Sequence, residues 1–356
     1  MVGTSFQAQG GITSVVRSYV DYGIFDAWGI NYVVTYEKSA KLTQVRVMCA
    51  ALWRIFWLLA LGRVSLVHMH SASRGSFWRK SLVAGMAWLF RVPYVFHIHS
   101  GEFPVFYGEC GPRGQAWIRW VLRHAGRVVA LTGHWQRTIQ AIEPAARIAL
   151  VGNPVHVPGA LAPLREPAKT VLFLGRMQLK KGIFDLVNAI PAVLAAVPDA
   201  HFVLAGDGEL AAAKQRVAEL GVGHAVEFTG WVDGVKKQAL LERADLFVLP
   251  SYFEALPVGL LEAMSSGIPI VSTAVGGIPD FIGHEVDGML VTPGAVAPLA
   301  AAMVALLGDA GMRGRLREHA FGRVGREYSF AAVMAQLQQI YVELGEPVGA
   351  IVPKRA

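Results

Sequence analysis

The sequence predicts two doubly wound α/β domains, each built on a parallel sheet of Rossmann type. Short apolar runs of strand length alternate with helical segments along most of the chain, which is the pattern of βα units. The chain has 356 residues, enough for two domains of ordinary size. The segment 154–169 carries Pro154, Pro158, Pro163 and Pro167, and a second βα series begins directly after it. This proline-rich segment is therefore predicted to link the two domains.

These boundaries divide the chain into five parts. We expect an N-terminal domain over 1–153, the linker over 154–169, a second domain over 170–326, a terminal helix over 327–345 and a loose tail over 346–356. The first strand is incomplete, because residues 1–5 have the character of a strand end rather than of a whole strand. A native start upstream of Met1 and a truncated chain are the two alternatives.

Composition limits the partners and the compartment. The chain is 53% hydrophobic and 17% charged, and its net charge of +7 favours anionic partners such as nucleotides, an anionic membrane surface or nucleic acid. Two cysteines form no disulfide or metal framework, which fits a reducing cytoplasm. The first ten residues lack the basic start and the apolar stretch of a signal peptide. A cytoplasmic location is expected.

The most informative stretch is Leu249–Asp280. An apolar strand ends at Pro250, because proline cannot continue a central strand, and a helix is predicted over 257–266. Glu254 lies just before this helix and Glu262 lies within it. Two carboxylates therefore flank the start of one helix.

This arrangement suits a nucleotide sugar. The amides of Ala255, Leu256, Val258 and Gly259 lie at the positive end of the helix dipole and can hold a diphosphate. Carboxylates repel phosphate but accept hydrogen bonds from hydroxyls, and a nucleotide sugar carries hydroxyls on both sides of its diphosphate. The alternative is that Glu254 and Glu262 are ordinary helix-start and surface acids. The flanking Pro-Ser, Gly-Pro and Gly-Gly pairs favour the ligand site.

A cationic segment, GRMQLKKG, follows the predicted strand at 170–175. Arg176 offers a planar fork to two phosphate oxygens, and Lys181 offers a compact charge. Lys180 is a neighbour that could substitute, and solvated loop charges are the alternative interpretation.

The stretch PSYFEALPVGLLEAMSSGIPIVSTAVGGIPD resembles the donor-binding signature of family 4 retaining glycosyltransferases, which have the GT-B fold. GRMQLKKG is similar to the G-R-x4-K-G diphosphate element of this family, and the resemblance covers nearly the whole chain. It implies two Rossmann-like domains that face each other across a cleft, with a C-terminal helix at 327–345 that crosses back to the first domain.

The resemblance also implies a role for each matching residue. The donor diphosphate would be bound by Gly11, Arg176, Lys181, Leu256 and Val258. The ribose would be bound by Glu262, the nucleobase would lie beside Trp231 and Val232, and the donor sugar would lie beside Gly10, Ala255 and Pro257. Glu254 would bind the hexose hydroxyls and favour positive charge on the sugar ring during catalysis. For the Gly10-Gly11 pair, an ordinary turn is the alternative.

Two strand-like segments, 64–71 and 92–100, end in histidines. Alternation along a strand puts His68 and His70 on one face, and likewise His97 and His99. Zinc binding is disfavoured, because no cysteine or acid has the matching spacing. VPYVFHIHS resembles the family's Pro-strand-His element and places its histidine at His99, where it would contact the donor sugar near the reacting carbon. A satisfied core histidine is the alternative.

Two segments bear on the acceptor. The helix predicted over 41–63 is apolar nearly all round, which is typical of a buried helix, although its tryptophans and arginines also suit a helix lying against an anionic membrane. The segment 100–115 is rich in Gly and Pro, and we expect a long loop that shapes the acceptor side.

We therefore predict a retaining, metal-independent hexosyltransferase that needs no cofactor. The expected donor is GDP-mannose, with a UDP-sugar as second choice. The expected acceptor is an undecaprenyl-diphosphate-linked oligosaccharide in bacterial exopolysaccharide synthesis, which would place the protein peripherally on the inner face of the plasma membrane. The alternatives are a soluble transferase with a small-molecule acceptor and a non-enzymatic nucleotide- or nucleic-acid-binding protein. The last would not need both Glu254 and Glu262, so no nucleic-acid partner is expected.

Overall fold

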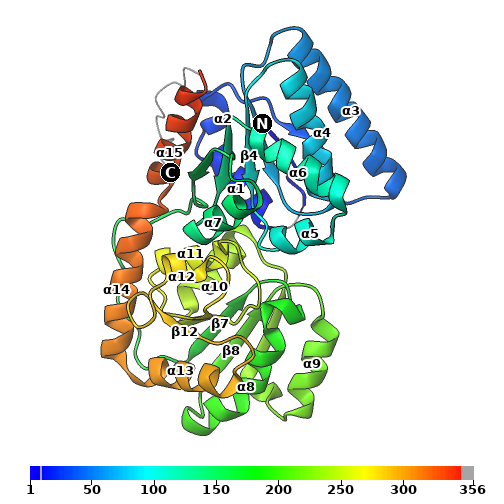
Figure 1. The fold of residues 1–356 in the computed structure, drawn as a ribbon. Coiled ribbons are helices and arrows are strands. Elements are labelled where there is room, and N and C mark those ends of the chain that lie inside the picture. Colours follow the sequence, from blue (N-terminus) through cyan, green and yellow to red (C-terminus); the bar gives the residue numbers. More distant parts are fainter. Residues whose placement is uncertain (9, 346–356) are drawn as a thin grey trace. The chain divides into compact units, whose positions relative to one another are not determined.

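The computed structural model describes residues 1–8 and 10–345, which form two compact units (Figure 1). The first unit contains Met1–Pro154 and also the chain from Ala331 onward, and the second contains Val155–Phe330. Each unit holds a six-stranded sheet in which all neighbouring strands are parallel. The predicted fold class, two Rossmann-like α/β domains, is confirmed.

In the first unit the strand order is β2-β1-β3-β4-β5-β6. The strands are β1 (Val2–Gly3), β2 (Val33–Val34), β3 (Val67–Ser71), β4 (Tyr94–Ile98), β5 (Arg127–Ala130) and β6 (Ile148–Leu150). The helices are α1 (Gly11–Asp21), α2 (Ile24–Ala27), α3 (Lys41–Ala60), α4 (Gly75–Leu89), α5 (Phe103–Glu109), α6 (Pro112–His124), α7 (Gly133–Ile142) and α15 (Phe330–Glu343). The central strands β3 and β4 are buried at every residue, as expected of a sheet with both faces covered.

In the second unit the order is β12-β11-β10-β7-β8-β9. The strands are β7 (Thr170–Leu174), β8 (His201–Ala205), β9 (Val226–Gly230), β10 (Leu246–Leu249), β11 (Ile270–Thr273) and β12 (Met289–Val291). The α-helices are α8 (Ile183–Ala196), α9 (Leu210–Glu219), α10 (Gly234–Arg243), α11 (Val258–Ser265), α12 (Ile278–Phe281), α13 (Val296–Gly308) and α14 (Ala310–Glu327), and the short 3-10 helices are η1 (Leu179–Lys181) and η2 (Gly223–Ala225). This strand order reverses between β7 and β10.

The segment predicted as a linker packs on the second unit. Arg165 Nε lies 3.0 Å from Asp245 Oδ1, and Val155 forms an isolated parallel bridge with Ser329. The terminal helix α15 belongs to the first unit, where Arg127 pairs with Glu343 at 2.6 Å. The predicted tail at 346–356 lies outside the described residues.

The prediction of a long loop over 100–115 is wrong. Most of this segment is helical, in α5 and the start of α6. Pro104 and Pro112 each occupy the first turn of a helix, where the missing N–H costs nothing, so these prolines start helices rather than break them.

The helix predicted over 41–63 forms as α3, but the interpretation as a buried helix is wrong. Ala51, Ile55 and Leu59 are its buried residues, whereas Trp53 is 66% exposed. By length and composition alone α3 could cross a membrane. Its sequence resembles that of a core helix because apolar residues lie all round it, but only one side packs on the domain.

Candidate functional site

The loops after β7 and β10 meet at the switch point of the second sheet. The two strands are direct neighbours, with Phe247 paired to Leu172, so both loops leave from the same edge. In doubly wound sheets, ligands bind outside the carboxyl ends of the strands at such a switch point. The loop after β7 carries Arg176 and Lys181, and the loop after β10 carries Glu254.

Lys181 and Glu254 are in direct contact at this point. Lys181 Nζ lies 2.5 Å from Glu254 Oε1, and the hydroxyl of Ser251 donates to the same oxygen at 2.8 Å. Glu254 is only 7% exposed. A buried carboxylate is costly unless it is paired and hydrogen-bonded, so Lys181 and Ser251 offset the cost of holding this charge inside the protein. The structure thus brings together two residues that the sequence places 73 positions apart.

The two loops touch backbone to backbone. Gly182 has φ +69°, and a Cβ at this position would lie 1.9 Å from the carbonyl oxygen of Pro250. Only glycine can occupy such a position without displacing the neighbouring loop. Tyr252 N also donates to the Lys180 carbonyl at 2.9 Å. The separation between the cationic loop and the carboxylate loop is therefore fixed by main-chain contacts.

Helix α11 begins at Val258, one residue later than predicted, and Pro257 occupies its N-cap position. In the described part of the chain no side chain caps the first turn, so the positive end of the helix dipole faces the loop that holds Glu254. Ala255, Leu256 and Pro257 are buried between that carboxylate and the helix. A helix start of this kind favours an anion.

Glu262 lies four residues beyond the start of α11 and forms an ion pair that the sequence does not predict. Its Oε1 accepts a hydrogen bond from Lys237 Nζ at 2.5 Å. Lys237 lies on α10, which follows β9, and a contact between side chains of different elements has no local sequence signal. Two acid–lysine pairs, Glu254–Lys181 and Glu262–Lys237, thus lie on the segments that flank the α11 start.

Three further predicted residues lie at the carboxyl ends of β7 and β9, which flank β8 in the sheet. Arg176 follows β7, and its Nε lies 3.6 Å from Oδ1 of Asp207, which follows β8. The Arg176 side chain is 45% exposed, so much of its guanidinium faces solvent. Trp231 and Val232 follow β9; Trp231 is 37% exposed and Val232 is half-buried. An exposed arginine and an exposed indole at one sheet edge can contact a phosphate and a base.

In the first unit, Gly10 and Gly11 form the entry to α1. Gly10 has φ +144° and Gly11 is the first helical residue. Both are exposed, and a Cβ at either would meet nothing within 4 Å. The positive φ of Gly10 explains the first glycine of the pair, whereas no packing demand explains the second.

The four histidines of β3 and the β4 segment gather on one face of the first sheet. His68 Nε2 lies 3.2 Å from His97 Nδ1, and His70 Nδ1 lies 2.9 Å from His99 Nε2. The rings of His97 and His99 are stacked, with centroids 4.0 Å apart. His68 Nδ1 also bonds the Tyr341 hydroxyl of α15 at 2.6 Å. His99 is therefore held by His70 and by ring stacking rather than standing alone.

These imidazoles are kept neutral. Desolvation lowers the pKa of His68, His70 and His97 well below the ordinary value, and the neighbouring histidines lower it further. Desolvation lowers the pKa of His99 to about 3, although part of its side chain is exposed. A neutral His99 can donate or accept a hydrogen bond to a sugar hydroxyl, with its tautomer set by the bond to His70.

The cluster has metal-compatible ligands but is already hydrogen-bonded. One nitrogen from each of His68, His70 and His97 lies within 4.8 Å of the others. Nε2 of His70 and Nε2 of His97 are buried without a hydrogen-bond partner among the described residues. Zinc needs ligand nitrogens at about 2.0–2.1 Å, so an ion would require the rings to move together and His68 to give up a bond. Metal-independent chemistry remains a prediction.

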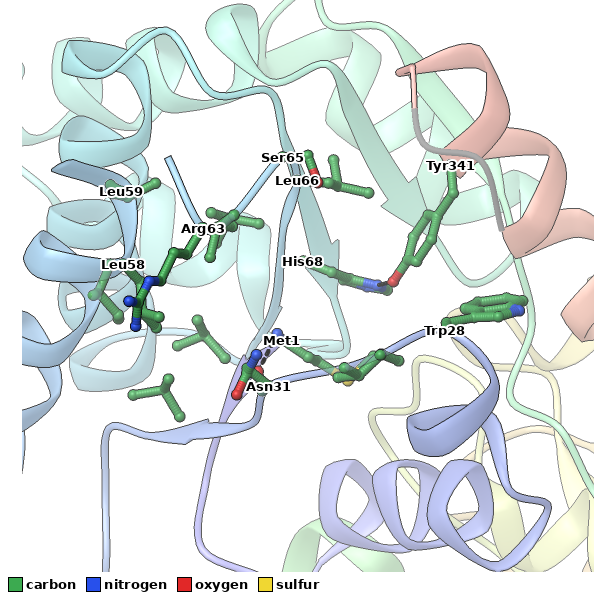
Figure 2. A pocket seen from close by; sticks show the side chains of 17 residues that line it. Met1, Trp28, Asn31, Leu58, Leu59, Arg63, Ser65, Leu66, His68 and Tyr341 are labelled. Carbon is green, nitrogen blue, oxygen red and sulfur yellow. Dashed lines mark hydrogen bonds between the residues drawn. The ribbon is translucent and has the colours of Figure 1, made fainter. Parts of the chain in front are cut away.

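A pocket in the first unit lies at the amino ends of the strands, opposite their carboxyl ends (Figure 2). Residues that precede β1, β2 and β3 line it, among them Met1, Asn31 and Leu66, and His68 and Tyr341 meet at its edge. Ligand sites of doubly wound folds lie at the carboxyl ends of the strands, so this pocket is not part of the candidate site.

Comparisons with known proteins cover both units. Residues 168–309 match the family described as glycosyl transferases group 1, and residues 25–154 match the glycosyl transferase 4-like domain. The glycogen synthase of Mycobacterium tuberculosis is 25% identical over 356 aligned residues, which span 86% of this chain and 83% of that protein. The phosphatidyl-myo-inositol mannosyltransferase of Mycobacterium leprae is 29% identical over 301 residues, which span 80% and 75%.

Two solved structures share the fold over nearly their full lengths. Sucrose-phosphate synthase from Thermosynechococcus elongatus has a TM-score of 0.77 at 20% identity, with 96% of this chain and 98% of that chain covered. Anabaena HepE in complex with UDP-glucose has a TM-score of 0.72 at 20% identity, with 97% and 99% covered. At these identities the likeness concerns the fold alone.

Proposed function

Because the chain belongs to the group 1 family of retaining glycosyltransferases, which transfer a sugar from a nucleotide sugar, we propose that it moves a hexose to a lipid-linked oligosaccharide. One observation carries the assignment of the site. Glu254 is buried against Lys181 at the switch point of the sheet, directly before the start of α11. Within the described residues, no side chain caps the first turn of this helix. A carboxylate, an ammonium and a helix dipole side by side suit a hexose joined to a diphosphate.

The cationic groups support the departure of the diphosphate. Negative charge develops on the leaving group as the bond to the anomeric carbon breaks, and preorganised positive charge stabilises it most. Lys181, Arg176 and the first turn of α11 supply that charge from three different segments. Lys181 is fixed by its contact with Glu254, so little reorganisation is needed when the donor binds.

The acids act on the sugars. Glu254 accepts hydrogen bonds from hexose hydroxyls and favours positive charge on the ring, and Glu262 accepts those of the ribose. In the structure Glu254 accepts a hydrogen bond from Lys181, and Glu262 accepts one from Lys237. Lys181 can keep its hydrogen bond to Glu254 and donate its remaining protons to phosphate, because an ammonium group carries three donors. His99, held neutral by its surroundings, binds a donor-sugar hydroxyl near the reacting carbon.

The donor is proposed to be GDP-mannose, with a UDP-sugar as the competing choice. Similarity to a phosphatidyl-myo-inositol mannosyltransferase supports mannose, and the fold shared with HepE, solved with UDP-glucose, supports the alternative. Ligands stabilise the protein that binds them by mass action. A thermal-shift panel of GDP, UDP, GDP-mannose and UDP-glucose therefore separates the two, because only the true nucleotide raises the melting temperature at micromolar concentration.

The acceptor is proposed to be an oligosaccharide on undecaprenyl diphosphate, used in exopolysaccharide synthesis. This proposal places the protein on the cytoplasmic face of the plasma membrane. The basic composition and the exposed apolar helix α3 support it. A soluble transferase with a small acceptor would share every donor-side residue, so transfer to lipid-linked and to water-soluble acceptors should be compared directly.

Replacing Glu254 by Gln tests the site. We expect sugar transfer to fall at least about 100-fold, because one charge that acts in the transition state is lost, while the nucleotide diphosphate still binds. The matched control is Glu242→Gln on α10, where the side chain is exposed and bonded to Gln238. Circular dichroism and melting show whether each variant folds. Wild-type transfer by a folded Glu254→Gln protein would remove the proposed mechanism.

A further inference from the structure

The helices α3, α4 and α6 form one layer beside the first sheet (Figure 1). α3 contacts α4 and β2, and α4 contacts α6. In α3 the buried residues Ala51, Ile55 and Leu59 follow each other four positions apart, so a single stripe of this helix faces the domain. Of its other residues, five are half-buried and twelve are exposed.

The outward side of this layer is apolar and aromatic. Its exposed apolar residues are Leu42, Val45, Trp53, Phe56, Trp57 and Leu61 of the α3 segment and Trp78, Leu82, Trp88 and Leu89 of α4. We call these residues the α3–α4 surface. Soluble proteins expose single apolar side chains at many places, but a contiguous patch marks an interaction site.

Ring contacts make the patch continuous from one helix to the next. Phe56 of α3 contacts Phe90 at the end of α4, with centroids 5.5 Å apart, and Trp53 contacts Trp57 at 5.6 Å. Trp88 of α4 contacts Trp120 of α6 at 5.3 Å. The aromatic residues therefore extend across all three helices.

Positive charge surrounds this patch. Between positions 41 and 127 the sequence has two acidic residues, Glu102 and Glu109, and both pair with Arg74, at 2.9 and 2.8 Å. Within the described residues no ion pair is formed by Arg46, Arg54, Arg63 or Arg91, all of which are exposed. Aromatic residues among unpaired arginines match a surface with an apolar interior and an anionic outer layer.

We propose that the α3–α4 surface docks the protein on an anionic lipid bilayer, with α3 lying in the plane of the interface. Tryptophan and phenylalanine would enter the boundary between headgroups and acyl chains, and the arginines would contact lipid phosphates. The proposal extends the proposed function, since a lipid-linked acceptor lies in such a bilayer. Lipid binding and sugar transfer are nevertheless measured independently.

The packing of α3 favours this orientation over a membrane span. A spanning helix would leave β2 and α4 and withdraw Ala51, Ile55 and Leu59 from the core of the first unit. It would also carry the charged Arg54 to the inside of the bilayer, which is costly. An in-plane helix keeps the buried stripe and places Arg54 at headgroup level.

Flotation with lipid vesicles tests the proposal on the full chain. Vesicles of phosphatidylcholine with 30% phosphatidylglycerol should carry the protein, and pure phosphatidylcholine should carry much less. Arg46→Glu with Arg54→Glu should weaken binding by at least roughly 25-fold, from about fivefold for each arginine lost. The charge-matched control is Arg315→Glu with Arg326→Glu on α14, both exposed, which should bind as the wild type does. Binding should also fall with salt, because the attraction is screened.

A second variant tests the contribution of the exposed tryptophans to vesicle binding. Trp53→Ser with Trp57→Ser should reduce vesicle binding at least about tenfold while the melting temperature stays unchanged, since both side chains are exposed. Equal flotation of the wild type and both α3 variants would overturn the proposal. The proposal would also be overturned if sedimentation shows a wild-type dimer that is absent in the tryptophan variant while vesicle binding is unchanged. Wild-type transfer by Glu254→Gln together with intact flotation would remove the proposed catalytic site and leave this proposal standing by itself.

Discussion

Acidification should destabilise the first unit through its histidine cluster. His68, His70, His97 and His99 all have lowered pKa values in the folded protein, so they stay neutral while the unfolded chain takes up protons. Stability falls wherever the unfolded state binds more protons than the folded state as pH drops. The contribution of these histidines to the unfolding free energy is complete above pH 6.5, which is about the pKa of histidine in the unfolded chain. It is lost progressively as the pH falls below that value.

The size of the effect follows from the number of histidines. Each histidine lowers the unfolding free energy by up to about 1.3 kcal/mol between pH 7 and 5.5, if the folded state binds no proton in that range. Four histidines together cost up to about 5 kcal/mol, as much as the whole stability of a marginal domain. Carboxylates contribute little there, because they titrate mainly below pH 5. The loss should therefore begin near pH 6.5.

Tryptophan fluorescence reports this unit selectively, because Trp231 is the single tryptophan of the second unit. Urea titrations at pH 7.5, 6.5 and 5.5 give the unfolding free energy at each pH. His97→Gln should remove about a quarter of the pH dependence, whereas the exposed His319→Gln on α14 should leave it unchanged. A change below about 1 kcal/mol between pH 7.5 and 5.5 would refute the reasoning, since it would mean that the cluster accepts protons while folded.

Three further predictions concern the candidate site. Arg176→Ala should weaken the binding of the nucleotide diphosphate and of its sugar equally, whether these are GDP and GDP-sugar or UDP and UDP-sugar. Isothermal titration should show a loss of about 10- to 100-fold, because a charged hydrogen bond to phosphate is lost. Weaker binding of the sugar form alone would contradict this role of Arg176. Gly182→Ala should destabilise the second unit by more than about 2 kcal/mol in denaturant titrations followed by circular dichroism. Gly221→Ala is its control, because Gly221 has the same φ of +69° but open space around its Cβ, and equal losses would mean that the contact with Pro250 is unimportant. Transfer should survive dialysis against EDTA, and a loss that zinc restores would assign a metal to the histidine cluster.

The sequence was most informative where local pattern and topology agree. The local patterns predict that the loop with Lys181 and the loop with Glu254 both bind the donor. The observed strand order, with β7 beside β10, explains why Lys181 and Glu254 meet although 73 positions separate them. Lys237 could not be predicted as the partner of Glu262, because its side chain crosses from α10 to α11.

Other parts of the fold depended on packing that the sequence does not encode locally. Proline in a Gly-rich segment predicts a loop, although at the first turn of α5 and α6 it favours a helix. The exposure of α3 could not be read from its composition, because burial depends on whether a second layer covers it. The pairing of His68 with His97 and of His70 with His99 needed the register of β3 against β4.

The position of Tyr341 has a consequence for how the chain matures. This residue bonds His68, and Glu343 of the same helix bonds Arg127, so the first unit is completed by a segment that is synthesised after the whole second unit. The second unit, in contrast, is contiguous from Val155 to Phe330 and has all of its residues earlier. Synthesis thus completes the second unit before it reaches the closing helix of the first unit, which reverses the usual order of vectorial folding.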